Sequence, residues 1–179
     1  ILNSFCLVEL DRVTAAIANG GVGPALSRYL LAPLMTEEEI EKRKDLRRFP
    51  ANAEAWLQPK RWTLGAWPHK GGHSLVYAQQ CAVNAIWGEL SAGKGEGIFA
   101  VNGPPGTGKT TLLADLVAAT VTKRAQWLAG LPDSRAGFGR AIQIKDRLWL
   151  YPAQAGLLGH EIVVASANNG AVENVTREL

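Results

Sequence analysis

The sequence predicts an α/β fold with a parallel sheet, preceded by a mainly helical segment. An apolar run at residues 98–101 is typical of a buried strand and leads into a glycine-rich loop at 103–108. From Lys109 onward, apolar residues recur at helical spacing. A second buried strand at 162–165 precedes the start of another helix at 171–179. This order favours parallel strands joined by right-handed crossovers.

Composition restricts the class of protein. Of the 179 residues, 47% are hydrophobic and 20% charged, as in a folded globular chain, and a net charge of +3 is too mild to argue for nucleic acid. Cys6 and Cys81 match no metal or redox spacing, so a reducing, cytoplasmic setting is the simplest expectation. No apolar stretch is long enough to span a bilayer, and we expect no membrane partner. The chain opens on an isoleucine and closes inside a helical pattern, so we expect an excerpt from a longer protein.

Residues 1–74 are expected to form a mainly helical segment that ends in a linker rich in tryptophan and proline. Apolar spacing predicts one helix at 5–18 and a shorter one at 24–31. A third begins at Thr36 with a capping-box pattern, and its acidic residues precede its basic ones, as the helix dipole favours. We interpret this charge run as a solvated helix face because its two halves cancel, with a nucleic-acid patch as the alternative.

The linker holds three tryptophans, Trp56, Trp62 and Trp67. We expect them to anchor an irregular segment onto the core, because indoles bury a large apolar area. Stacking on bases beside Lys60 and Arg61 is the alternative. His69 and His73 have no clustered partner ligands, so we expect no metal there.

Residues 75–179 are expected to hold the α/β unit. Apolar positions predict a helix at 75–90, and a glycine-rich turn at 91–97 leads into the first strand. Between the helix after the loop and the second strand, residues 130–160 form a long insert with one candidate strand pair around 142–151. Inserts of this length are often functional or elaborate a fold.

Residues 103–110, Gly-Pro-Pro-Gly-Thr-Gly-Lys-Thr, fit the phosphate-binding pattern of two glycines, then Lys and Ser/Thr. Glycines let the backbone turn its N–H groups onto a phosphate, and a helix N-terminus adds a favourable dipole. We expect Lys109 and Thr110 to be catalytic, with the lysine on the β- and γ-phosphates and the threonine hydroxyl on Mg²⁺. The residues expected to bind the nucleotide here are Gly103, Pro104, Pro105, Gly106, Thr107, Gly108, Lys109, Thr110 and Thr111. A chance glycine turn is the alternative, and the regular flanks argue against it.

Two further stretches flank this loop. Residues 79–83, Gln-Gln-Cys-Ala-Val, are similar to a Gln-x-x-Ala-Val motif. Residues 163–174 are similar to a strand followed by Ser-Asn-x-Ala-Val-Asp-Asn, with Asn168 in the usual serine place and Glu173 for aspartate. Together with the loop and its paired prolines, they resemble the superfamily 1 helicases, in the 5′-to-3′ branch that includes the RNA-surveillance helicases and bacterial relatives.

The resemblance implies an incomplete RecA-like ATP-binding domain at 75–179, which uses ATP and Mg²⁺ and acts on single-stranded DNA or RNA. It implies that the amide of Gln79 contacts adenine, because an amide offers both a donor and an acceptor. An exposed polar helix residue is the alternative. The residues implied for a phosphate backbone are Asn168, Asn169, Gly170 and Asn174. Neutral donors at an open helix N-terminus suit that role, and plain capping of the helix is the alternative.

The family's acidic Mg²⁺-coordinating pair, its arginine fingers and its second lobe follow the last of these motifs and are not in this sequence. We therefore expect the full-length protein to be an ATP-dependent helicase, and this chain alone to hydrolyse ATP negligibly. The sequence does not distinguish DNA from RNA, or unwinding from translocation.

Two other interpretations are weighed against a helicase. Hexameric AAA+ ATPases share the loop, but there the second apolar strand after it ends in Asp-Glu, whereas here residues 162–165 lead into Ser-Ala-Asn. A P-loop ATPase that does not act on nucleic acid is thus the alternative function. A relic loop in a binding module is disfavoured, because Lys109 and Thr110 are both intact.

Overall fold

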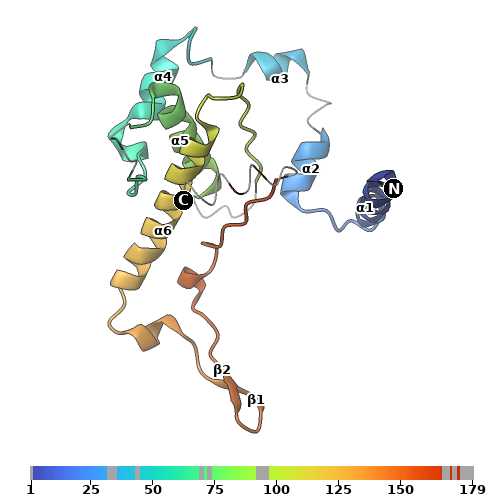
Figure 1. The fold of residues 1–179 in the computed structure, drawn as a ribbon, viewed down its shortest axis with the longest axis vertical. Helices are drawn as coiled ribbons and strands as arrows, with labels where there is room; N and C mark the ends of the chain where they lie inside the picture. The colour runs from blue at the N-terminus through green and yellow to red at the C-terminus, as the bar shows by residue number, and fades with distance from the viewer. Residues whose placement is uncertain are drawn as a thin grey trace.

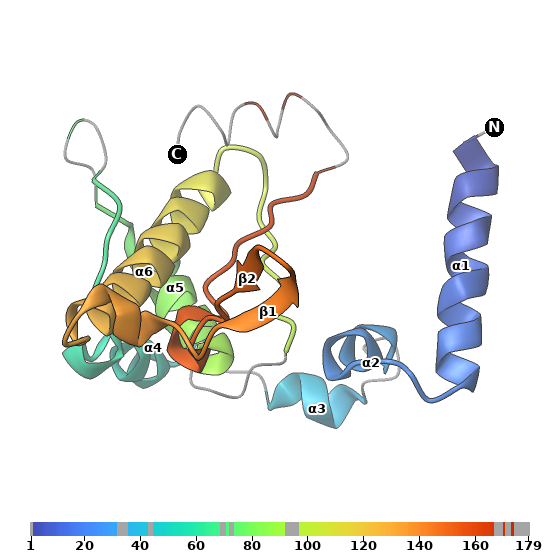
Figure 2. The same ribbon diagram turned by 90° about the horizontal axis from the view of Figure 1, so that it is seen from below.

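The computed structural model describes residues 2–31, 36–42, 45–68, 71, 74–91, 97–166, 170 and 173. Over these residues the chain is mostly helical (Figures 1 and 2). The α-helices are α1 (Leu2–Ala18), α2 (Pro24–Leu31), α3 (Glu37–Glu41), α4 (Pro50–Leu57), α5 (Tyr77–Leu90) and α6 (Lys109–Ala129). The remaining elements are the 3-10 helices η2 (Pro59–Arg61), η3 (Ser134–Gly137) and η4 (Ala155–Leu157) and the strands β1 (Ile142–Lys145) and β2 (Leu148–Leu150).

The prediction of a parallel, RecA-like sheet is wrong. The one sheet in the described residues is the antiparallel pair of β1 and β2. Residues 98–101 and 162–165 are irregular chain, and their apolar side chains face solvent, with Ile98 44% and Val163 91% exposed. An apolar run reports a tendency toward burial, whereas a strand also needs a neighbour that completes its hydrogen-bonded ladder. Neither run has such a neighbour in the part of the chain described here.

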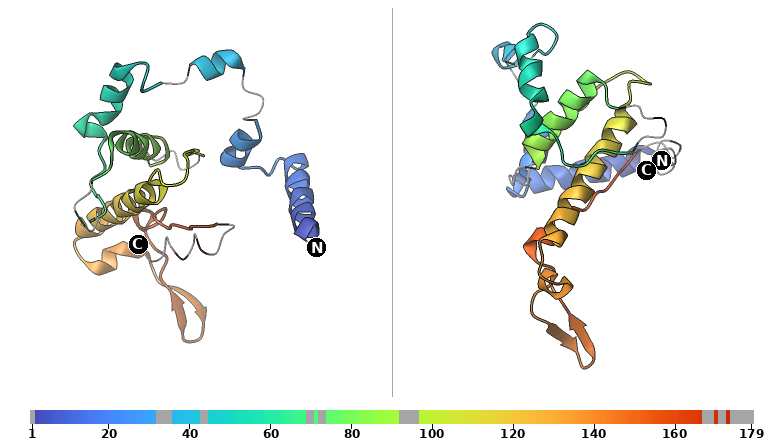
Figure 3. Two further views of the ribbon diagram at one scale, coloured as in Figure 1. Left: turned by 45° about the horizontal axis from the view of Figure 1, so that its top comes forward. Right: turned by 90° about the vertical axis from the view of Figure 1, so that its left-hand side faces the viewer.

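The core lies between α5 and α6, which pack side by side (Figure 3). Val83 is fully buried, and Ile86 and Leu112 are almost so. Three partly buried apolar side chains surround them: Leu75, Ala82 and Leu116. The prediction of a helix from Lys109 is confirmed, since α6 begins at that residue. Leu112 and Leu116 lie one turn apart and therefore share the face turned toward α5.

A buried amide fastens α4 to α5. Asn84 is 1% exposed, and its Nδ2 donates to the carbonyl of Trp56 at 2.8 Å. Its Oδ1 accepts from Gln80 Nε2 at 2.9 Å. Because a buried amide is costly unless it is hydrogen-bonded, this pair of bonds favours one placement of α4 on α5.

The tryptophan-rich segment lies along the helices. The backbone N–H of Trp67 donates to the buried carboxylate of Asp115 on α6 at 3.0 Å. The Arg61 guanidinium stacks 4.3 Å from the ring centre of Trp56. Trp56 and Trp67 are half-buried, as an anchoring role requires, whereas Trp62 is 55% exposed.

The predicted N-terminal helices α1 and α2 are present, and α1 lies apart from the α5–α6 core (Figures 1 and 2). The third is shorter than its charge pattern indicates. It ends at Glu41, and residues 45–48 form a separate turn ahead of α4.

The predicted strand pair near 142–151 is confirmed as an antiparallel hairpin, which extends away from the helices (Figure 1). Ile142 pairs with Leu150, and every residue of both strands is exposed. At the base of the insert, Leu157 is buried in η4, which contacts α6. No helix of the described residues is long and apolar enough to cross a membrane.

Candidate nucleotide-binding site

The glycine-rich loop at 103–108, which we name the phosphate loop after its expected ligand, folds as a turn that ends where α6 begins. Gly106 and Gly108 have φ values of +78° and +75°, a conformation that L side chains rarely adopt. The first backbone bond of the helix runs from Leu112 N to the Gly108 carbonyl at 3.1 Å. The exposed N-terminus of a 21-residue helix therefore lies directly behind the loop. Free N–H groups and the dipole of such an end favour an anion.

The ammonium group of Lys109 lies inside the turn of its own loop. Its Nζ donates to the carbonyl of Gly103 at 2.6 Å and to that of Pro104 at 2.8 Å. The hydroxyl of Thr107 donates to the same Pro104 carbonyl at 2.8 Å. The lysine is thus held at the loop by neutral oxygens, which are weaker partners for an ammonium than the oxygens of a phosphate.

Gln79 joins α5 to the loop. Its Nε2 donates to the carbonyls of Thr107 at 3.1 Å and Gly108 at 3.4 Å, and its Oε1 accepts from the backbone N–H of Val76 at 2.9 Å. Both ends of the amide expected to contact adenine are therefore bonded to the backbone. The neighbouring Gln80 bonds instead to Asn84, so Gln79 is the glutamine that reaches the loop.

A hollow of about 630 Å³ opens beside the loop. Its walls are the loop with the preceding residues 101–102, the first turns of α5 and α6, and Arg47, which is exposed. Lys109 and Arg47 are the charged residues of this lining, and no carboxylate belongs to it. Arg47 belongs to the charge run that we interpret from the sequence as a solvated helix face. The sequence therefore does not predict Arg47 as a residue of this site.

A turn fixes the backbone at Arg47. The carboxylate of Asp45 accepts hydrogen bonds from the backbone N–H groups of Arg47 at 2.8 Å and Arg48 at 3.0 Å. The bond from Arg48, then that from Arg47, lowers the pKa of Asp45 from its ordinary value. The carboxylate is consequently ionised at neutral pH and keeps the turn closed.

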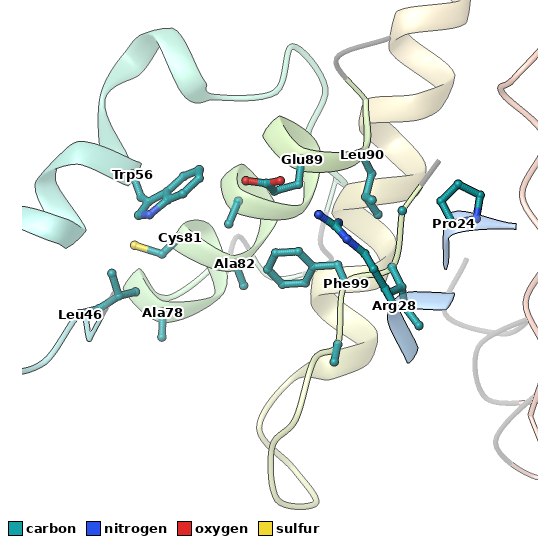
Figure 4. A pocket seen from close by; sticks show the side chains of 14 residues that line it. Pro24, Arg28, Leu46, Trp56, Ala78, Cys81, Ala82, Glu89, Leu90 and Phe99 are labelled. Carbon is teal, nitrogen blue, oxygen red and sulfur yellow. The ribbon is translucent and has the colours of Figure 1, made fainter. Parts of the chain in front are cut away.

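A second, larger hollow of about 910 Å³ shares Ala78 and Ala82 with the first. Figure 4 shows its mainly apolar lining, with Trp56 and Cys81 on one side and Phe99 on the other. Burial raises the pKa of the Cys81 thiol, which therefore stays protonated at neutral pH.

Four of the residues expected to bind the nucleotide, Pro105, Gly106, Thr110 and Thr111, do not belong to the lining of the hollow. Pro105 and Gly106 form the exposed tip, and Thr110 and Thr111 lie half-buried in the first turn of α6. Mg²⁺ is commonly bound by one or two protein oxygens together with substrate phosphates and water. Thr110 is the residue expected to supply such an oxygen, but it does not belong to the lining of the hollow. No group of three or more acidic, histidine or cysteine side chains that could hold a metal is found in the described residues.

Of the four residues implied for a nucleic-acid backbone, Asn168, Asn169 and Asn174 lie outside the described residues. Gly170 is helical and exposed. The role of this motif in binding nucleic acid therefore stays a prediction.

Comparisons with protein-family models, curated proteins and solved structures find no match for this chain. The resemblance to helicases thus rests on the three sequence motifs, and the site on its own geometry.

Proposed function

We propose that the chain binds ATP with Mg²⁺ in the hollow beside residues 103–110. The observation that carries this proposal is the placement of the Lys109 ammonium. It lies at 2.6 and 2.8 Å from loop carbonyls, in the wall of a 630 Å³ hollow whose charged lining residues are all cationic. An anion of the size of a nucleotide phosphate chain is the ligand that this charge favours.

In this proposal, nucleotide binding changes the oxygen atoms that accept hydrogen bonds from the Lys109 ammonium. The Lys109 ammonium leaves the carbonyls of Gly103 and Pro104 and bonds to phosphate oxygens, while the loop N–H groups and the start of α6 bind the same phosphates. The exchange is favourable because a charged acceptor replaces neutral ones. It needs only a movement of the flexible lysine side chain.

In this proposal, the first role of Gln79 is to support the loop, and contact with the adenine base is a second role. Its amide holds the carbonyls of Thr107 and Gly108 and so favours the left-handed turn that presents the loop N–H groups. A contact with adenine, as the helicase resemblance implies, requires that this amide release at least one of its present partners.

For hydrolysis, Lys109 would stabilise charge that develops on the transferred phosphoryl group, and Thr110 would hold Mg²⁺, which would supply further positive charge to the phosphates. The lining of the hollow offers no carboxylate to orient water. Negligible turnover by this chain alone is therefore part of the proposal.

We further propose, from the motif resemblance, that the parent protein is an ATP-dependent helicase that acts on single-stranded DNA or RNA through Asn168, Asn169, Gly170 and Asn174. A P-loop ATPase that does not act on nucleic acid is the alternative. The helicase and the alternative ATPase differ in their affinity for single-stranded nucleic acid, which is simple to measure. A helicase shows affinity for a fluorescein-labelled single strand that changes with bound nucleotide, and the alternative shows none.

Photolabelling with 8-azido-ATP tests the location of the site. Because the base extends from phosphates held at the loop, the label should fall in peptides that hold Arg47 or the first turns of α5, and excess ATP should prevent it. Labelling that excess ATP leaves unchanged, or that falls mainly in the β1–β2 hairpin, would contradict the proposed site.

A further inference from the structure

Arg47 lines the phosphate-loop hollow from an element far away in sequence. It lies 62 residues before Lys109 and belongs to the turn at 45–48, ahead of α4. Its neighbour Arg48 does not line the hollow, and the guanidinium of Arg48 lies over the ring of Phe49 at 5.7 Å. Of these two adjacent residues, Arg47 thus lines the hollow and Arg48 does not.

Hydrogen bonds position the turn that bears Arg47. Besides the two backbone N–H groups held by its carboxylate, Asp45 uses its own carbonyl to accept from the Asn52 side chain at 3.3 Å and from the Phe49 N–H at 3.2 Å. These bonds connect the turn to the first helical residues of α4. The position of Arg47 therefore follows the position of α4.

The helix α4 is in turn fixed to the helix that supports the loop. The bond from the buried Asn84 to the Trp56 carbonyl joins α4 to α5, and Gln79 of α5 holds the carbonyls of Thr107 and Gly108. One helix, α5, thus connects Arg47 and the phosphate loop, and its residues Ala78 and Ala82 line the same hollow.

We propose that Arg47 is a second cationic ligand for the phosphate chain of the nucleotide, and that it selects polyphosphates over the uncharged nucleoside. This inference rests on the proposed function of the site. A guanidinium presents a planar pair of N–H donors that matches two oxygens of a phosphate, whereas the lysine ammonium acts as a point charge. The lining holds no carboxylate that would form an ion pair with the guanidinium.

A guanidinium can also stack on a purine ring, and this alternative makes a different prediction. Stacking on the base would contribute to the binding of adenosine as much as to that of ATP. A phosphate ligand would contribute to ATP and to inorganic tripolyphosphate, and would leave adenosine unchanged.

The experiment is titration calorimetry of the full chain with ATP, tripolyphosphate and adenosine, in the wild type and in Arg47→Ala, Arg47→Lys and Arg48→Ala. The last variant removes an equal charge one residue away and serves as the matched control. We expect Arg47→Ala to weaken both ATP and tripolyphosphate by about ten-fold, the effect of one lost charge-assisted hydrogen bond. Arg47→Lys should recover part of this loss, and Arg48→Ala should stay within about two-fold of wild type, as one surface charge at a distance predicts.

The outcomes separate this inference from the proposed function. If Lys109→Ala abolishes ATP binding while Arg47→Ala binds ATP and tripolyphosphate like the wild type, Arg47 is not a ligand and the nucleotide site stands. If the wild type binds neither ATP nor tripolyphosphate, both proposals fail together. Equal losses in Arg47→Ala and Arg48→Ala would show a general charge effect and overturn the specific role. A melting curve for each variant confirms that the fold is kept.

Discussion

The side-chain amide of Gln79 donates to the backbone carbonyl of Thr107 at 3.1 Å, and this bond joins the start of α5 to the phosphate loop. The same amide nitrogen occupies the space that a Cβ at Gly108 would need. The glycine at 108 is therefore required twice, once for its positive φ and once for the close approach of Gln79. The helix and the loop are linked by contacts that a sequence motif does not show.

We predict that Gly108→Ala destabilises the protein more than Gly106→Ala. Both residues have positive φ, so both substitutions incur the strain of roughly 1–2 kcal/mol that an L residue pays there. A Cβ at 106 meets nothing within 4 Å, whereas one at 108 collides with Gln79. Losing the bonds of that amide should add about 1 kcal/mol. Urea denaturation measures the difference.

A double-mutant cycle checks the cause of that difference. In a Gln79→Ala background, the alanine substitutions at 106 and 108 should cost the same free energy of unfolding, because no amide remains to be displaced. A difference that persists without Gln79 would show that the amide is not the reason.

Leu112→Ala should lower the free energy of unfolding by about 2–5 kcal/mol, as truncation of a buried leucine commonly does. Leu112 is 7% exposed and belongs to the core cluster with Val83 and Ile86. Val121→Ala on the same helix is the control, since Val121 is 59% exposed and should change stability by less than about 0.5 kcal/mol. Equal effects in chemical denaturation would mean that the α5–α6 contact is not the core.

Asp45→Asn should destabilise the chain at neutral pH and have less effect in acid. The folded-state pKa of Asp45 is held below its ordinary value of 3.8 by the N–H of Arg48 and then that of Arg47. A lowered pKa stabilises the fold above the unfolded value, and this stabilisation is lost as the pH falls through the folded pKa. The difference between wild type and variant in denaturation midpoint should thus be present at pH 7 and shrink below pH 3.8. A difference that is constant with pH would count against ionisation of Asp45 as its source.

Replacing both Asn168 and Asn169 with alanine should weaken single-strand binding by about ten-fold to a hundred-fold, if each lost hydrogen bond contributes roughly 0.5–1.5 kcal/mol and the effects add. Neutral donors release no counterions, so the slope of log affinity against log salt should barely change. Fluorescence anisotropy at several salt concentrations measures both quantities, and a melting curve shows any loss of a helix cap. Unchanged strand affinity with a lower melting temperature would identify the asparagines as caps and remove the most specific support for a helicase.

Local signals in the sequence predicted local structure. Glycines with a following lysine and threonine located the turn and the first residue of α6, and alternating turn formers and apolar residues located the hairpin near Ile142. Both elements complete their hydrogen bonds within a short stretch of chain, so neighbouring residues determine them.

The long-range features could not be predicted in the same way. A parallel ladder depends on partners far away in sequence, and the apolar run at 98–101 carries no information about whether a partner is present. The position of Arg47 relative to the loop depends on how the turn at Asp45, α4 and α5 are joined. The hydrogen bond of Asn84 joins α4 to α5, and that of Gln79 joins α5 to the loop. A charge run alone does not show which of its arginines faces a hollow.

The most direct test of a nucleotide site at residues 103–110 is the equilibrium affinity of Mg²⁺–ATP for the wild type and for Lys109→Ala, measured by titration calorimetry on the 179-residue chain. The Lys109 ammonium donates to the loop carbonyls of Gly103 and Pro104, so its removal should spare the fold while it removes the proposed phosphate ligand. We predict saturable binding by the wild type with one nucleotide per chain, and a loss of affinity of at least about ten-fold in the variant, with the melting temperature of the free protein nearly unchanged. Equal affinities in the two proteins, or no saturable binding by a folded wild type, would contradict the account.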